Sequence, residues 1–208
     1  LAADFKMPRI HAHLVKRIPS QAGLGGGSSD AAYMIRLLDE RFRLNIGIPE
    51  MEKYAARLGA DCAFFISADP EDGDSASYAE GIGEELMPVS GPGDNLSGKY
   101  IVVVKRDDIA VSTKEAYAAI TPKKPAKCCR DIVRQPIDTW KDELVNDFEA
   151  PIFQLHPELA EIKEKLYSLG AAYAAMSGSG SAIFGIFKNK PSHIEEQFEG
   201  MFCKTMKL

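Results

Sequence analysis

The glycine-rich segment 19–29 (Pro-Ser-Gln-Ala-Gly-Leu-Gly-Gly-Gly-Ser-Ser) constrains the fold of this chain more than any other feature. Between Gly23 and Gly27 only Leu24 interrupts the glycines, so no Cβ atom keeps the main chain away from another group. The preceding residues 9–16 alternate apolar and polar side chains, which predicts a half-buried strand. Residues 30–42 place apolar side chains on one helical face. The sequence therefore predicts a strand, a tight glycine turn and a helix.

A glycine turn at the start of a helix predicts phosphate binding. Its backbone N–H groups can converge on phosphate oxygens beside the positive end of the helix dipole. Ser28 and Ser29 add hydroxyl groups that can contact phosphate or a magnesium ion, and Leu24 is expected to point inward. A flexible Gly/Ser linker is the alternative interpretation, but a linker need not stand between a strand and an amphipathic helix. The spacing matches neither a Walker A loop nor a Rossmann fingerprint.

The rest of the chain predicts an α+β protein in which strands and helices alternate. A turn-rich stretch at 90–98 predicts a boundary between a domain at 1–94 and a domain at 95–208, and the acidic stretch 67–77 predicts a surface loop. The predicted helices are 49–58, 112–120 with a Ser112–Glu115 capping box, 159–169 and a final helix through 194–202; the predicted strands are 62–66, 100–104, 171–176 and 182–187.

Composition excludes several classes of function. The net charge is −5 and the basic residues are scattered, so the chain carries no basic footprint for nucleic acid. No apolar run approaches the about 20 residues that span a bilayer, and no signal peptide opens the chain. The four cysteines show no CxxC spacing, which predicts a reduced, cytoplasmic protein.

No metal site is predicted from the residues. His11 and His13 share one face of the predicted strand, but no third ligand stands near them in the sequence. The acidic residues 69–74 lack the spacing and the terminal Glu of an EF-hand loop.

The glycine segment resembles the second motif of the GHMP kinases, which has the form Pro-x-x-x-Gly-Leu-Gly-Ser-Ser-Ala-Ala. Its longer form here, Gly-Leu-Gly-Gly-Gly-Ser-Ser-Asp-Ala-Ala at 23–32, is similar to one branch of that family. Further matches to the branch follow in the same order, and the resemblance spans nearly the whole chain. They are Arg-Leu-Gly-Ala-Asp-Cys-Ala-Phe-Phe at 57–65, Ala-Glu-Gly-Ile-Gly-Glu at 79–84, Asn-Asp-Phe-Glu at 146–149 and Met-Ser-Gly-Ser-Gly-Ser-Ala at 176–182.

The resemblance implies a two-domain fold and a set of site residues. The N-terminal domain would be βα-rich and bind ATP with Mg²⁺, and the C-terminal domain would be a ferredoxin-like α/β domain. Asp61 would be the catalytic base, although Asp after Gly-Ala is by itself more typical of a turn. The implied ATP-binding residues are Pro19, Ala22, Gly23, Leu24, Gly25, Gly26, Gly27, Ser28 and Ser29, and those that shape the site are Gly178, Ser179 and Gly180.

The activity that the resemblance implies is phosphorylation of the 2-hydroxyl of a cytidine diphosphate ester of methylerythritol, in non-mevalonate isoprenoid synthesis. The protein would be a monomer or homodimer that binds neither nucleic acid nor membrane. Two alternatives stay open: another GHMP small-molecule kinase, or a nucleotide-binding module without catalysis. The second arises because the family's catalytic lysine and first strand are expected upstream of Leu1, and Lys16 lies on the wrong side of the loop to replace that lysine.

Overall fold

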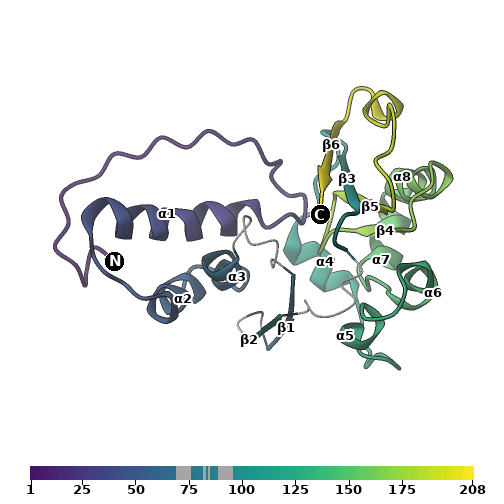
Figure 1. Cartoon of the computed structure of the whole chain (residues 1–208). Helices are drawn as coiled ribbons and strands as arrows, with labels where there is room; N and C mark the ends of the chain where they lie inside the picture. The colour runs from purple at the N-terminus through teal and green to yellow at the C-terminus, as the bar shows by residue number, and fades with distance from the viewer. Residues whose placement is uncertain (69–75, 82, 84, 89–95) are drawn as a thin grey trace. The chain divides into compact units, whose positions relative to one another are not determined.

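The computed structural model describes residues 1–68, 76–81, 83, 85–88 and 96–208 (Figure 1). The chain divides into two compact units. The first comprises Leu1–Ile18 and Gly25–Ser90, and the second comprises Pro19–Leu24 and Gly91–Leu208. The glycine-rich segment is thus shared between the units. Most of the predicted boundary stretch, 90–98, lies outside the described residues, so the domain limits 1–94 and 95–208 stay a prediction.

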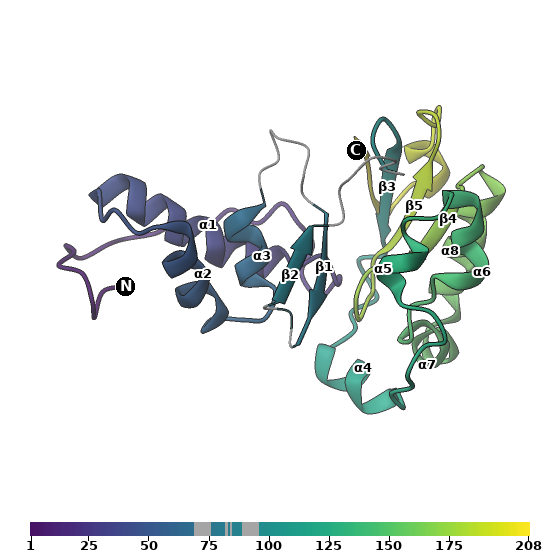
Figure 2. The ribbon, with the colours of Figure 1, turned by 60° about the horizontal axis from the view of Figure 1, so that its bottom comes forward.

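The first unit is a small helical cluster followed by a hairpin (Figure 2). Gly25, in the left-handed region with φ +61°, caps α1, and Arg43 ends this helix in the same region. Buried apolar side chains from all three helices form one core: Ala32, Ile35, Ile46, Met51, Ala55, Cys62 and Ile66. The elements are α1 (Gly26–Phe42), α2 (Ile48–Ala56), α3 (Cys62–Ser67) and the antiparallel strands β1 (Ser77–Glu80) and β2 (Glu85–Pro88).

Two strand predictions in the first unit are wrong. Residues 9–16 form no regular structure, and Leu14 and Val15 are 62% and 66% exposed. An alternating segment becomes a strand only where another strand accepts its hydrogen bonds, and within the described ranges none pairs with it. Residues 62–66 belong to helix α3, because a short apolar run fits a buried helix turn as well as a strand.

The helix predictions in the first unit hold with shifted ends. Helix α1 begins at Gly26, four residues earlier than predicted, so the last four residues of the glycine segment, 26–29, are helical. Helix α2 has Pro49 in its first turn, as predicted, and ends at Ala56. The predicted acidic loop 67–77 falls mostly on 69–75, which lie outside the described residues.

The second unit is built on a four-stranded antiparallel sheet. Its strands are β3 (Tyr100–Lys105), β4 (Tyr173–Met176), β5 (Ile183–Phe187) and β6 (Phe202–Lys207), in the order β4-β5-β3-β6. Helix α8 (Pro157–Ser168) is the last of the helices in the connection from β3 to β4, and the 3₁₀ turn η2 (Glu195–Phe198) lies between β5 and β6. This order and connectivity is the ferredoxin-like βαββαβ arrangement that the resemblance implied, with its second helix reduced to one turn.

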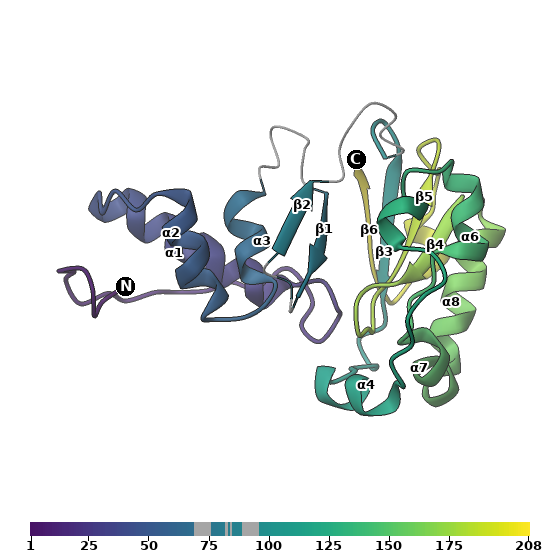
Figure 3. The ribbon, with the colours of Figure 1, turned by 90° about the horizontal axis from the view of Figure 1, so that it is seen from below.

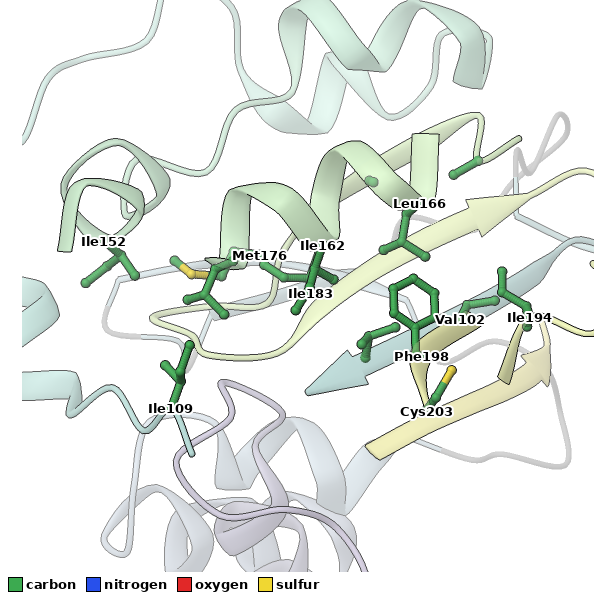
Figure 4. Close-up of a cluster of buried hydrophobic side chains, with 14 of the residues drawn as sticks. Val102, Ile109, Ile152, Ile162, Leu166, Met176, Ile183, Ile194, Phe198 and Cys203 are labelled. Carbon is green, nitrogen blue, oxygen red and sulfur yellow. The ribbon is translucent and has the colours of Figure 1, made fainter. Parts of the chain in front are cut away.

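Helices cover both faces of this sheet, and Figure 3 shows α8 lying along it. On one face Ile162 and Leu166 of α8 point toward Val102, with Phe198 filling the layer between them (Figure 4). On the other face Trp140 packs edge-on against Tyr173, with ring centroids 5.6 Å apart. The remaining elements are α4 (Thr113–Ala119), α5 (Cys129–Ile132), η1 (Ile137–Thr139), α6 (Trp140–Glu143) and α7 (Glu149–Leu155).

The predictions for the second unit are confirmed except at its end. Strands β3, β4 and β5 and helices α4 and α8 lie where expected, and the Ser112 side chain accepts a hydrogen bond from Glu115 N at 3.1 Å. The prediction of a final helix through 194–202 is wrong. Gly200, with φ +78°, turns the chain, and Phe202 then opens β6 against the edge of β3. Strands β1, β2 and β6 were not predicted.

Across the described ranges, no helix is both long enough and apolar enough to cross a bilayer. None of the four cysteines, all of them described, forms a disulfide.

Candidate active site

The first turn of α1 presents open hydrogen-bond donors. The N–H groups of the first residues of a helix have no acceptor within it, and Gly25 offers no side-chain cap. No acidic residue stands in this turn, and a Cβ at Gly27 would meet no atom within 4 Å. Gly26 is buried against Ile18, but Gly27 is exposed. Gly27 and Ser28 therefore offer N–H groups at the positive end of a 17-residue helix, an arrangement that suits a phosphate group.

The turn that carries Asp61 lies beside this helix end in the first unit. A Cβ built on Gly59 would stand 4.0 Å from Ser28 Oγ, which places residues 59–61 next to the first turn of α1. Asp61 is exposed, and its carboxylate caps no backbone group of α3. Ser28 and the turn that carries Asp61, some thirty residues apart in the sequence, are thus neighbours in the first unit.

Gly83, in the hairpin between β1 and β2, packs against the same turn. A Cβ on Gly83 would stand 3.4 Å from both the Cβ and the carbonyl oxygen of Ala60. Gly83 therefore supports the turn that presents Asp61.

Lys16 forms an ion pair with Asp30 of helix α1. A Cβ built on Gly26 would stand 3.6 Å from Lys16 Nζ, so the ammonium group lies at the first turn of the helix. Lys16 is exposed and pairs with Asp30 close to the open donors.

The first half of the glycine segment is fastened to the turn between β4 and β5, within the second unit. Ser177 Oγ donates to the carbonyl of Gly23 at 2.7 Å, and Ala182 N donates to the carbonyl of Ala22 at 3.0 Å. Gly23 has φ +69°, and a Cβ there would lie 1.8 Å from the Ser177 carbonyl oxygen. Only glycine permits this approach. Leu24 packs partly buried against Ala22, Val103 and Ala182.

The small-residue turn after β4 contains the three residues expected to shape the site. Gly178 and Gly180 have φ +52° and +92°, and Ser179 Oγ lies 3.5 Å from Thr113 Oγ1 at the start of α4. Ser181 is fully buried and donates to the Ile109 carbonyl at 2.7 Å. The turn is therefore held at several points along its backbone.

Two residues of this region carry a role that sequence analysis did not assign. Asn146 donates to the carbonyls of Met176, at the end of β4, and of Gly178 in the turn, and Glu149 accepts from the backbone N–H of Met176. The only signal in the sequence was their place in the Asn-Asp-Phe-Glu motif.

Within the part of the chain that the structure describes, no group of three or more His, Cys, Asp or Glu residues is placed to hold a metal ion. Of the predicted site residues, 25–29 and Asp61 lie in the first unit, whereas Pro19, Ala22, Gly23, Leu24 and residues 178–180 lie in the second.

Comparison with known proteins gives matches along most of the chain. Residues 1–69 match the family model described as GHMP kinases N terminal domain, and residues 130–206 match the model described as GHMP kinases C terminal. A 4-diphosphocytidyl-2-C-methyl-D-erythritol kinase of Bacteroides fragilis is 46% identical over 208 residues, which are 100% of this chain and 72% of that protein. The chain belongs to the GHMP kinases.

Other members of the GHMP kinases agree. The 4-diphosphocytidyl-2-C-methyl-D-erythritol kinase of Bacteroides thetaiotaomicron is 47% identical over 98% of this chain and 71% of its own length. A crystal structure of 4-(cytidine 5'-diphospho)-2C-methyl-D-erythritol kinase matches with a TM-score of 0.69 and 30% identity, over 93% of this chain and 69% of that one. Homoserine kinase from Cytophaga hutchinsonii shares the fold, with a TM-score of 0.58 at 13% identity.

Proposed function

We propose that this GHMP kinase transfers the γ-phosphoryl group of ATP to the 2-hydroxyl of 4-diphosphocytidyl-2-C-methyl-D-erythritol, in non-mevalonate isoprenoid synthesis. One observation carries the proposal: the turn 59–61, which presents the exposed Asp61, lies beside the open first turn of α1 in the first unit. Phosphoryl transfer needs a positioned phosphate and a group that orients or deprotonates the attacking hydroxyl, and these two features supply them. The identity of the acceptor is supported by the relatives of this name.

Each residue then has a defined role in the transfer. The N–H groups of Gly27 and Ser28 hold phosphate oxygens, and the Lys16–Asp30 ion pair lies beside them. Asp61 accepts the proton of the substrate hydroxyl while the hydroxyl oxygen bonds to the γ-phosphorus of ATP. The bond from that phosphorus to the oxygen that bridges it to the β-phosphate breaks, and ADP is released. Residues 19–24 and 178–180 give the glycine loop its shape.

Magnesium ion fits this site mainly as a partner of the nucleotide, because the described residues include no cluster of three metal-binding side chains. When bound, Mg²⁺ neutralises charge on the phosphates. The hydroxyl groups of Ser28 and Ser29 stand in the α1 turn, where a phosphate-bound ion can reach them. The proposal also includes a cytoplasmic location, a monomer or homodimer, and domains at 1–94 and 95–208.

The test replaces Asp61 by Asn, which keeps the shape and removes the base. We expect kcat to fall roughly 10²- to 10⁴-fold, the usual contribution of general base catalysis, with little change in the dissociation constant of ATP. Asp107→Asn, at another exposed carboxylate in the second unit, is the matched control and keeps full activity. Formation of ADP with the cytidyl substrate measures turnover, and calorimetry measures ATP binding.

Two results would overturn the assignment. Unchanged kcat in Asp61→Asn rejects this residue as the base. Faster turnover of mevalonate or homoserine than of the cytidyl substrate by the unmodified protein rejects the acceptor and favours another GHMP activity.

A further inference from the structure

Asn146 bridges the end of β4 and the turn that follows it. Its amide nitrogen Nδ2 donates to the carbonyl of Met176 and to the carbonyl of Gly178, each at 2.8 Å. An amide NH₂ group has two hydrogens, so both bonds form at once and use its full donor capacity. Its Oδ1 accepts from Phe148 N at 2.9 Å. One side chain therefore sets the distance between the last residue of β4 and the middle of the turn.

Glu149 binds the backbone N–H of Met176, the residue whose carbonyl Asn146 binds. Its Oε1 accepts from Met176 N at 2.7 Å, and its Oε2 pairs with Lys163 Nζ at 2.5 Å. Glu149 is buried, at 8% exposure. A buried carboxylate is stable only when its oxygens are bonded. Glu149 therefore requires both Met176 N and Lys163 as partners, and these bonds fix its position. Burial, and next the charge of Glu149, raise the pKa of the neighbouring Tyr173, whose hydroxyl donates to the Leu144 carbonyl.

The turn after β4 is itself bonded to the first half of the glycine segment. Ser177 Oγ bonds to the carbonyl of Gly23, and the N–H groups of Ser181 and Ala182 bond to the carbonyls of Gln21 and Ala22 at 3.3 and 3.0 Å. The hydrogen bonds described for Asn146 and Glu149 do not go to residues 21–23. They go to the backbone of β4 and the following turn, to which residues 21–23 are bonded.

We propose that Asn146 and Glu149 are positioning residues for nucleotide binding, which act by holding the turn 176–180 in the shape that the glycine segment 21–23 requires. This inference rests on one part of the proposed function, the binding of a nucleotide by the glycine loop. It does not depend on which hydroxyl is phosphorylated.

Asn146→Asp separates this role from a structural one. The aspartate keeps an oxygen that accepts from Phe148 N, so the start of α7 stays capped, but it cannot donate to the Met176 and Gly178 carbonyls. If Asn146 served only α7, Asn146→Asp would behave as the unmodified protein. Tyr167→Phe is the matched control, because it removes another part-buried side-chain bond to the sheet, from Tyr167 Oη to the Ala174 carbonyl at 3.1 Å.

Three measurements are made on each protein: amide hydrogen exchange at Ser181 and Ala182, the dissociation constant of a non-hydrolysable ATP analogue, and KM for ATP with kcat. For Asn146→Asp we expect the dissociation constant and KM to rise roughly tenfold, as the loss of two net hydrogen bonds predicts, with a smaller change in kcat. Exchange at both amides becomes faster. Tyr167→Phe changes none of the three.

Glu149 gives a second pair of variants, in case Asn146→Asp does not fold. Glu149→Leu removes the acceptor for Met176 N and should weaken analogue binding, whereas Glu149→Gln keeps that acceptor and should restore it. Unchanged exchange and analogue binding in Asn146→Asp, or equal losses in Tyr167→Phe, would overturn the proposal. An unmodified protein that binds the analogue but does not phosphorylate the cytidyl substrate would contradict the proposed acceptor alone.

Discussion

Replacing Gly23 by alanine introduces two separate penalties. The left-handed φ of +69° costs an L-residue about 1–2 kcal/mol. The new Cβ would lie 1.8 Å from the Ser177 carbonyl oxygen, far inside any real contact, so the two backbones must separate. Separation breaks the bonds from Ser177 Oγ to Gly23 and from Ala182 N to Ala22, at about 1 kcal/mol each. We therefore expect Gly23→Ala to lower the free energy of unfolding of the second unit by about 3–4 kcal/mol.

The chain provides controls that isolate each penalty. Gly170, after α8, has φ +98°, but no atom lies within 4 Å of the place that a Cβ would occupy, so Gly170→Ala carries only the backbone cost of about 1–2 kcal/mol. Gly27 lies in helix α1 without positive φ and without a neighbour within 4 Å. Gly27→Ala carries neither penalty and should stabilise the protein by up to about 1 kcal/mol, since alanine favours helix.

Urea unfolding, followed by a probe in each unit, measures the series. The expected order of stability is Gly27→Ala, unmodified protein, Gly170→Ala and then Gly23→Ala. Binding of an ATP analogue should weaken in Gly23→Ala and stay unchanged in Gly170→Ala. If Gly23→Ala is as stable as Gly170→Ala, the close approach of Gly23 to Ser177 does not exist in solution and the reasoning fails.

Two further predictions concern single interactions. Ser112→Ala removes the N-cap bond to Glu115 N and should lower the free energy of unfolding by about 1 kcal/mol, with Ser112→Asp restoring it in urea titration. The hydrogen bond to Glu196 raises the pKa of His193, so the stability from this pair is present below the unfolded pKa and is lost as pH rises through the folded pKa. Glu196→Gln should lower the His193 midpoint in an NMR titration; an unmoved midpoint would show that the pair does not form.

Helices α1, α2, α4 and α8 and strands β3, β4 and β5 could be predicted because their sequence signals are local. Helices α1, α2 and α8 carry long amphipathic patterns, and β3 is a continuous apolar run. Residues 9–16 have the alternation of a strand, but alternation carries no information on whether a partner strand is present. Residues 62–66 were too short for the pattern to distinguish helix from strand. Strand β6 (Phe-Cys-Lys-Thr-Met-Lys) is half polar because it lies at the edge of the sheet.

Sequence motifs suggest candidate site residues, but they do not predict the contacts between them. The glycines and Asp61 stand out by type and by the family motifs that contain them. The close approach that requires glycine at position 23 involves Ser177, which is 154 residues away in the chain. The roles of Asn146 and Glu149 likewise depend on a turn about thirty residues further on, and no local pattern reports such a pairing.

The distance in sequence between the glycine segment and its partner turn also orders events in folding. Helices α1, α2 and α3 are close in sequence and can pack as soon as they are synthesised, because short loops close at little entropic cost. Residues 21–23 cannot adopt their bonded form until residues 177–182 have emerged and β4 has paired with β5. The earliest motif in the chain is therefore among the last to mature, and a newly made chain acquires its helices well before it acquires a finished glycine loop.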